Sequence, residues 1–251
     1  MEWYPTPSYL LKRKVILDFV CSVQVRDFLE VGCGAGDLLA ALGSRGYQGM
    51  GIDISTDALA AARKRVSFLS IVVEQMEVAE VSGQFDLVIA SEVLEHCEDD
   101  VGLLQELKLK LRTGAYLLLT VPAHMAKWGA NDDFCGHLRR YERQELHDKL
   151  VAAGLHPVSI QAYGVPLYNL MKPFYDRAIR KKLRDGLDQR KRTEESSGMW
   201  LFTGMRRVFP LLFNNVVMSP FYLLQRLFFN SDLGNGYFVV AQKRPLSGGI
   251  K

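Results

Sequence analysis

The sequence predicts a doubly wound α/β domain built on a mostly parallel β-sheet. Segments that are apolar along almost their whole length alternate with segments of helical periodicity. Such strands are typical of sheets covered on both faces, and the helices between them supply the crossovers that parallel pairing requires. A glycine-rich turn after the first strand, and acids at the ends of the first two strands, complete the pattern.

The first half of the chain sets up this alternation. Residues 9–23 place apolar side chains on one face of a helix. Gly43 or Gly46 can end a short helix after the glycine turn, and Ser55 or Thr56 can cap the next one. In order, we expect a helix over 9–23, a strand over 28–31, a helix over 37–42, a strand over 50–54, a helix ending at 66 and a strand over 68–73.

The second half continues it. A turn at Gly83 leads into a strand, Asp99 or Asp100 can cap a leucine-rich helix that includes Leu111, and Gly114 ends that helix. The remaining expected elements are a strand over 85–90, the helix just described, a strand over 115–121 closed by Pro122, a helix that holds Glu145 and Leu146, and strands over 155–163 and 236–243.

Composition narrows the functional class. The chain has 251 residues, 48% of them hydrophobic and 24% charged, and its net charge of +3 is too small to argue for a nucleic-acid partner by itself. The four cysteines include no C-x-x-C pair, so neither a disulfide framework nor a zinc knuckle is indicated. The opening MEWYP lacks the basic start and apolar block of a signal peptide, so we expect a cytoplasmic protein.

The most informative segment is the run FLEVGCGAG at residues 28–36. Its glycines let the backbone turn tightly and approach a ligand closely, and Asp53 at the next strand end suits a ribose diol. The dinucleotide spacing G-x-G-x-x-G would place its third glycine at Asp37, and a further acid, Glu30, is unfavourable beside a pyrophosphate. The segment therefore predicts a nucleoside cofactor with a cationic centre. The alternative is a strand-to-helix turn that holds no ligand.

These residues resemble the first motif of the class I S-adenosylmethionine-dependent methyltransferases, E-x-G-x-G-x-G, which is matched at Glu30, Gly32, Gly34 and Gly36. The segment FDLVIASEVLEH at 85–96 resembles the fourth-strand motif of the branch related to ubiquinone biosynthesis. The segment LRTG at 111–114 resembles the L-k-p-G-G of those enzymes, with Thr and Ala replacing Pro and the second Gly. The likeness covers about residues 25–163 together with the last strand. It implies seven strands, the last of them antiparallel.

The resemblance also implies a cofactor and a reaction. The cofactor would be S-adenosyl-L-methionine, the product S-adenosyl-L-homocysteine, and the reaction an in-line methyl transfer. Gln75 and Met76 stand where these enzymes contact adenine. No carboxylate cluster signals a magnesium site, so we expect no metal. The expected cofactor-binding residues are Glu30, Gly32, Cys33, Gly34, Gly36, Asp53, Ile54, Gln75, Met76 and Ser91.

The acceptor side is expected in the loop after the fifth strand. Residues 122–141 are dense in histidine, arginine, acids and aromatics, and their G-H-x-R-R-Y pattern recurs near the pocket mouth in a subgroup of the resembled enzymes. The expected substrate-binding residues are Trp128, Arg139, Arg140 and Tyr141. Alternatively, the two arginines pair with Asp132 and Asp133 to pin the loop.

Histidine accepts a proton near neutrality, so a histidine here could serve as a base for a hydroxyl acceptor. The candidate catalytic residues are His137, His124 and His96. His96 could instead cap the helix that starts near Asp99, and His137 could be a satisfied structural histidine.

The expected class of acceptor follows from sequence motifs of other methyltransferase subclasses that this chain lacks. The chain has Ala90-Ser91-Glu92 after the fourth strand, where exocyclic-amine nucleic-acid enzymes carry Asn or Asp before Pro-Pro. Cys97 lies too far along to be a cytosine-attacking nucleophile. We therefore expect a small-molecule or lipid-linked acceptor, methylated on oxygen, and no nucleic acid. An N- or C-methyltransferase, or a non-catalytic protein that keeps the fold for binding, is the alternative.

Three parts are expected along the chain. Residues 1–24 form a helical cap, residues 25–163 and 234–246 the cofactor-binding domain, and residues 164–233 a helical insert. Eight basic residues against two acids lie between 177 and 192, and residues 208–225 lack charge but are too short and too interrupted to span a membrane. The insert is read as a lid, as a peripheral contact with the inner face of a membrane through 177–229, or as a dimer contact. Acceptor identity and oligomeric state stay open.

Overall fold

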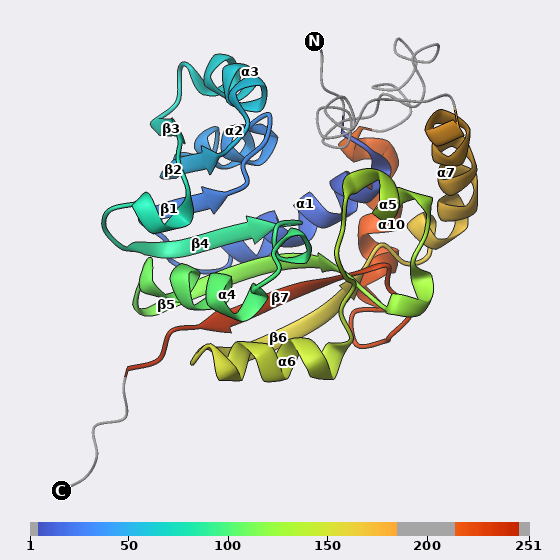
Figure 1. Cartoon of the computed structure of the whole chain (residues 1–251). Coiled ribbons are helices and arrows are strands. Elements are labelled where there is room, and N and C mark those ends of the chain that lie inside the picture. The colour runs from blue at the N-terminus through green and yellow to red at the C-terminus, as the bar shows by residue number, and fades with distance from the viewer. Residues whose placement is uncertain (1–4, 185–213, 246–251) are drawn as a thin grey trace, which may run out of the picture.

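A seven-stranded sheet crosses the molecule, with helices on both of its faces (Figure 1). The structure, a computed structural model, describes residues 5–184 and 214–245. The strand order is β3-β2-β1-β4-β5-β7-β6, and β7 runs antiparallel to both of its neighbours while the other pairs are parallel. The strands are β1 (Asp27–Val31), β2 (Gln48–Asp53), β3 (Ile71–Gln75), β4 (Phe85–Ser91), β5 (Leu111–Pro122), β6 (His156–Tyr163) and β7 (Gly236–Gln242). This arrangement confirms the predicted fold class.

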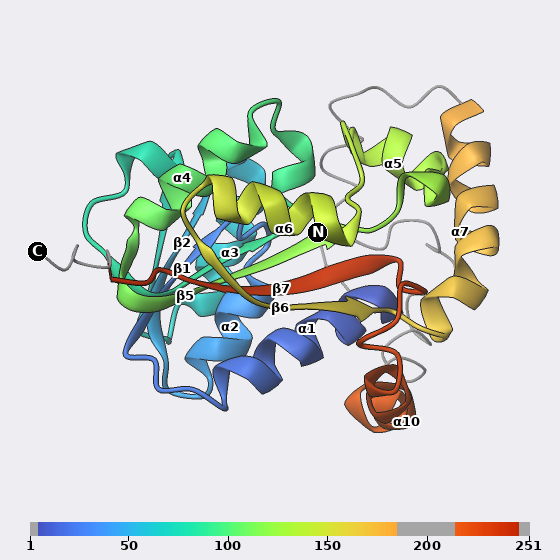
Figure 2. The same ribbon diagram turned by 90° about the horizontal axis from the view of Figure 1, so that it is seen from below.

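Two apolar layers fix the helices to the sheet. One is built around α4 and α6 and the other around α1, α2 and α3, and the two helix layers lie on opposite sides of the strands (Figure 2). Burial of leucine and valine from both layers is the main stabilising contribution. The helices are α1 (Pro7–Val20), α2 (Asp37–Gly43), α3 (Thr56–Val66), α4 (Asp100–Leu109), α5 (Ala130–Cys135), α6 (Arg143–Ala152), α7 (Leu167–Arg184) and α10 (Asn215–Arg226).

The capping expectations are confirmed. The side chain of Ser55 accepts a hydrogen bond from the backbone N–H of Ala58 at 3.3 Å, and that of Asp99 accepts one from Gly102 at 2.8 Å. These bonds satisfy N–H groups that the first helical turn leaves without an internal partner.

Three element boundaries were wrong. The first helix ends at Val20 rather than at residue 23. The third strand begins at Ile71, because its ladder to β2 starts at the pair Gly49–Ile71, and Phe68 is instead exposed on the turn before it. Leu111 does not belong to α4. It opens β5, where it pairs with Phe85, so Gly114 lies inside the strand region and does not end the helix.

The described part of the expected insert forms two helices at the carboxyl end of the sheet (Figures 1 and 2). α7 follows β6 directly, and α10 packs on α1 through Met218 and Tyr222 against Leu10 and Leu11. Within the described ranges, no helix has both the length and the apolar character needed to cross a bilayer. The last three basic residues of that run (Arg190, Lys191 and Arg192), and the aromatic residues Phe209 and Phe213, lie outside the described residues.

Candidate active site

The predicted cofactor residues gather at the carboxyl edge of the sheet. Glu30 lies near the end of β1, Asp53 and Gln75 end the neighbouring strands β2 and β3, and Ser91 ends β4. Because these strands are parallel, their carboxyl ends meet at one edge, which is where α/β sheets bind ligands.

The glycine loop presents one open position. Gly32, Gly34 and Gly36 all have positive φ values, +68°, +51° and +74°, which glycine adopts without strain. A Cβ at Gly32 would lie 2.6 Å from Cγ2 of Val93, and one at Gly36 would lie 2.9 Å from Cβ of Ala62. A Cβ at Gly34 would meet nothing within 4 Å. Gly32 and Gly36 are therefore fixed by packing, whereas Gly34 faces space that a ligand can use.

Asp53 links this loop to the end of β2. Its carboxylate accepts hydrogen bonds from the backbone N–H of Gly34 at 2.8 Å and of Ser55 at 2.9 Å. The next side chain, Ile54, is 75% exposed although it is apolar, and its carbonyl accepts a bond from Gln75 at 3.2 Å. Asp53 and Ile54 thus offer a polar acceptor and an apolar surface side by side, as a ribose and its base require.

Glu30 is a buried acid that forms no ion pair with any cation of the described residues. Only 4% of it is exposed, and among the described residues its Oε2 has no hydrogen-bond partner. Burial raises the pKa of Glu30 well above its usual value, the negative charge of Asp37 raises it further, and Lys12 lowers it. Asp37 is itself satisfied by Tyr9 at 2.9 Å and Arg13 at 2.7 Å. An unpaired buried carboxylate in a ligand-facing region favours a cationic ligand.

Glu92, the residue that follows β4, lies between the cofactor residues and the expected acceptor residues. Glu92 has a φ of +57°, uncommon for a residue with a side chain. Its Oε1 accepts a bond from the hydroxyl of Tyr163 at 2.9 Å and lies 3.7 Å from Nζ of Lys12. Burial opposes ionisation of Glu92, but Lys12, His137 and Tyr163 outweigh it and hold its pKa below the usual value. Glu92 is therefore an ionised acid at the centre of the site.

Ser91, an expected cofactor contact, hydrogen-bonds Thr120 across the sheet at 2.8 Å. Cys33, within the glycine loop, is buried, and Met76, after β3, packs against the core. No finding tests the cofactor contacts themselves, which stay predictions.

His137 is oriented by an acid that the sequence reasoning considered only for pinning the loop. Its Nδ1 lies 2.9 Å from Oδ1 of Asp132, and the same oxygen accepts a bond from Nε of Arg140 at 2.8 Å. Burial opposes ionisation of Asp132, but these two hydrogen bonds outweigh it and lower its pKa. An ionised carboxylate only accepts, so Nδ1 of His137 donates, and in the neutral form of the ring Nε2 is the proton acceptor.

Glu95 faces that free nitrogen. Oε1 of Glu95 lies 3.7 Å from Nε2 of His137, and within the described chain neither Glu95 oxygen has a hydrogen-bond partner. Burial raises the pKa of Glu95 well above its usual value, and the charge of Glu92 adds to the shift. The ring of His96 meets that of His137 edge-on at 5.0 Å. Possible ligand atoms of Glu95, His96 and His137 lie within 4.8 Å of one another, so this group could hold a metal ion.

The other expected acceptor residues bind the protein itself. His124 uses both ring nitrogens, toward Glu142 at 2.8 Å and Tyr237 at 3.3 Å. Trp128 donates to Asp133 at 2.9 Å. These bonds hold the loop after β5 in place.

Arg139, Arg140 and Tyr141 are also engaged. Arg140 and Tyr141 are buried. Arg139 donates a hydrogen bond to Oδ2 of Asp100 at 3.0 Å, and the hydroxyl of Tyr141 donates to the same oxygen at 3.1 Å. The pinning alternative thus holds for Arg140 with Asp132, while Arg139 pairs with Asp100 rather than Asp133. Substrate contact by these residues stays a prediction.

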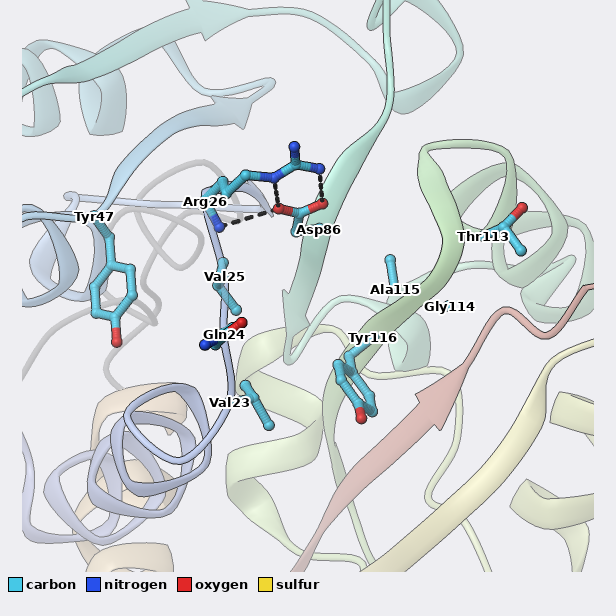
Figure 3. A pocket seen from close by; sticks show the side chains of 10 residues that line it. All are labelled: Val23, Gln24, Val25, Arg26, Tyr47, Asp86, Thr113, Gly114, Ala115 and Tyr116. Carbon is cyan, nitrogen blue, oxygen red and sulfur yellow. Dashed lines mark hydrogen bonds and ion pairs between the residues drawn. The ribbon is translucent and has the colours of Figure 1, made fainter.

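A separate pocket of about 610 Å³ lies at the opposite edge of the sheet (Figure 3). Its wall includes the segment before β1 and the beginnings of β4 and β5, and Arg26 pairs with Asp86 across it. Because it borders the amino ends of the strands, it is distinct from the glycine-loop site.

Comparisons with known proteins identify a family and partly matching relatives. A family model described as a methyltransferase domain matches residues 10–160. The ubiquinone biosynthesis O-methyltransferase of Pseudomonas paraeruginosa is 35% identical over 99 residues, which cover 37% of this chain and 42% of that protein. The matched stretch thus spans less than half of that relative.

Two solved structures share the fold over 93% of this chain. The phosphoethanolamine N-methyltransferase 2 of Haemonchus contortus, in complex with S-adenosyl-L-methionine, aligns with a TM-score of 0.59 at 16% identity and 52% coverage of its own chain. The cyclase SpnF aligns with a TM-score of 0.62 at 17% identity and 80% coverage. At these identities the likeness is one of fold.

Proposed function

The chain belongs to the methyltransferase family, in the class that uses S-adenosylmethionine, and on that basis we propose that it methylates an oxygen atom of a small-molecule or lipid-linked acceptor. The observation that carries the proposal is the buried, unpaired carboxylate of Glu30 beside the open position at Gly34. A scaffold without a ligand gains nothing from such a pair, because burying an unpaired carboxylate opposes folding.

The residues fit this cofactor. When bound, S-adenosylmethionine supplies a methyl group on a sulfonium centre. Glu30 offers a carboxylate to a cationic group, Asp53 offers oxygens to a ribose, and Ile54 offers an exposed apolar surface to adenine. An acid-rich site of this kind is unfavourable for a pyrophosphate and favourable for a cation.

His137 is the base in this proposal. A hydroxyl acceptor holds its proton tightly, so transfer to oxygen gains from a group that removes it, typically by a factor of about 10²–10⁴. Nε2 of His137 would take that proton, and Asp132 would keep Nδ1 protonated and stabilise the charged ring. Arg140 holds Asp132 in place. The remaining acceleration comes from holding both reactants in contact and excluding water.

The name of the Pseudomonas relative supports oxygen as the methylated atom, since that protein is an O-methyltransferase. The likeness covers too little of that enzyme to transfer its substrate.

The test is a transfer assay with the full chain, cofactor tritiated on the methyl group, and a cell extract. We expect label in an extractable small molecule or lipid, released as volatile methyl iodide when methyl ethers are cleaved with hydriodic acid. Label that resists this cleavage would point to nitrogen or carbon. Cofactor binding without any transfer to extract fractions would favour the non-catalytic alternative.

A further inference from the structure

Helix α10 exposes an apolar stripe to solvent. Its inner face packs on α1 through Met218 and Tyr222, yet its outer face is also apolar. The stripe follows helical spacing and consists of Val216, Val217, Leu223, Leu224 and Leu227. Val216 is 81% exposed and Leu227 is 79% exposed, and we call these five residues the α10 stripe. A surface helix normally keeps its outer face polar.

Helix α7 also exposes apolar side chains, and it adds positively charged ones. Leu170 and Phe174 are exposed on it, and Arg177, Arg180 and Lys181 follow on the exposed side of its second half.

The acids are missing from both outer faces. The α10 sequence contains no acidic residue, and the one acid of α7, Asp176, is buried and paired with Lys172 at 2.5 Å. Exposed apolar side chains next to unopposed cations are typical of segments that lie on an anionic membrane.

We propose that the α10 stripe and the exposed apolar and basic side chains of α7 dock this protein on an anionic membrane surface. Both helices lie at the carboxyl end of the sheet and contact α1 (Figures 1 and 2). α1 also carries Tyr9 and Lys12, which reach the cofactor side of the site. Docking would therefore hold the site close to the lipid, which deepens the proposed function by making a membrane-borne acceptor the accessible one.

Charge decides between a membrane and a second copy of the chain. In a twofold dimer the same surface meets itself. Arg177 and Lys181 would then face a partner surface that is equally basic, and the described parts of α7 and α10 offer no exposed acid to balance them. An anionic lipid surface supplies the opposite charge without such repulsion.

The test is flotation of the full chain with phosphatidylcholine vesicles, with and without phosphatidylglycerol. We expect binding to the anionic vesicles at low salt and weaker binding at high salt, because screening reduces the attraction of the basic residues. Leu223→Gln with Leu227→Gln should lower the partition coefficient by about tenfold or more, since two leucine side chains no longer enter the acyl boundary of the membrane. Arg177→Gln with Lys181→Gln should reduce both binding and its salt dependence.

The matched control changes equally exposed apolar residues elsewhere. Leu109 on α4 and Leu223 are both 65% exposed, and Phe68 is more so. Phe68→Gln with Leu109→Gln should leave flotation unchanged. Absence of flotation at low salt, or an equal loss in the control, would overturn the proposal. So would a dimer, seen by light scattering without lipid, that the α10 variant splits while vesicles fail to bind.

Calorimetry with S-adenosylmethionine on every variant separates the two proposals. Vesicle binding without cofactor binding would reject the proposed function and leave the docking surface intact. Cofactor binding without vesicle binding would do the reverse.

Discussion

The two halves of the candidate site treat their polar groups in opposite ways. In the cofactor half, Oε2 of Glu30 is buried with no hydrogen-bond partner in the part of the chain that the structure describes, and Gly34 faces open space. In the loop after β5, the side chains of Arg140, Tyr141 and His124 form hydrogen bonds with other residues of the protein. The difference indicates that the cofactor half is built to receive a ligand, while most of the acceptor loop is built to hold its own shape.

One ring nitrogen is the exception in the acceptor half. Among the described residues, Nε2 of His137 has no hydrogen-bond partner, and its nearest acid is Glu95 at 3.7 Å, so it is the group that we propose for chemistry. Unsatisfied groups, rather than residue types, therefore mark where this molecule acts on something else.

The largest expected effect concerns His137. His137→Ala should lower turnover by about 10²–10⁴-fold and leave cofactor affinity unchanged, because it removes the proposed base and no expected cofactor contact. His124→Ala is the control, and we expect a much smaller loss because both of its ring nitrogens are already engaged. Steady-state kinetics with calorimetry check this. Equal losses of turnover in the two variants would contradict the distinction.

The next effect is on stability. Arg140→Met should lower the free energy of unfolding by about 3–5 kcal/mol, because it leaves the buried carboxylate of Asp132 without its cation. Arg139→Met should cost no more than about 1 kcal/mol, since that side chain is partly exposed and Lys149 still pairs with Asp100. Urea unfolding measures both. A similar cost for the two would mean that the loop is not pinned through Arg140.

A pH dependence follows from Glu95. Its pKa is raised in the folded state by burial, whereas the unfolded value is about 4.3. The folded state therefore binds more protons in this range, and stability falls as pH rises from about 4.3 through the folded pKa. The slope from one group is at most about 1.4 kcal/mol per pH unit. Glu95→Gln should flatten the profile of urea midpoints between these two pKa values. An unchanged profile would show that Glu95 ionises as freely in the folded protein as in the unfolded chain.

The smallest expected effect separates two glycines of the same loop. Gly34→Ala should cost about 1–2 kcal/mol of stability from its positive φ alone. Gly36→Ala should cost more, because its Cβ would also press on Ala62. Cofactor affinity, measured by calorimetry, should fall for Gly34→Ala because the methyl group enters the ligand space. Thermal melts give the stability order, and a reversed order would contradict the packing described for Gly36.

The sequence predicted those features of the site that depend only on residues close together in the chain. Glu30, the three glycines and Asp53 follow from a strand that ends in a tight turn, and the structure places them at one edge as expected. The hydrogen-bond partners of the side chains could not be predicted in the same way. Arg140 reaches Asp132, Ala123 and Asn235, the last of these 95 positions away, and such contacts exist only once the sheet is assembled.

The role of Asp132 was missed for a local reason. The left-handed turn at Gly136 ends α5 and returns His137 onto Asp132, five residues back. The spacing Asp-x₄-His with a glycine before the histidine was visible in the chain, and it is the signal that could have found the pair. The third strand was placed too early because the apolar Phe68 is exposed, a feature that an apolar run does not reveal.

The most direct measurement is a calorimetric titration of S-adenosylmethionine into the protein and into Glu30→Gln over a range of pH. If the cation of the cofactor meets the buried carboxylate of Glu30, the affinity of the unaltered protein rises with pH through the raised pKa of that group. The Glu30→Gln variant should bind more weakly and without this rise. Equal affinities with the same pH profile would contradict the account.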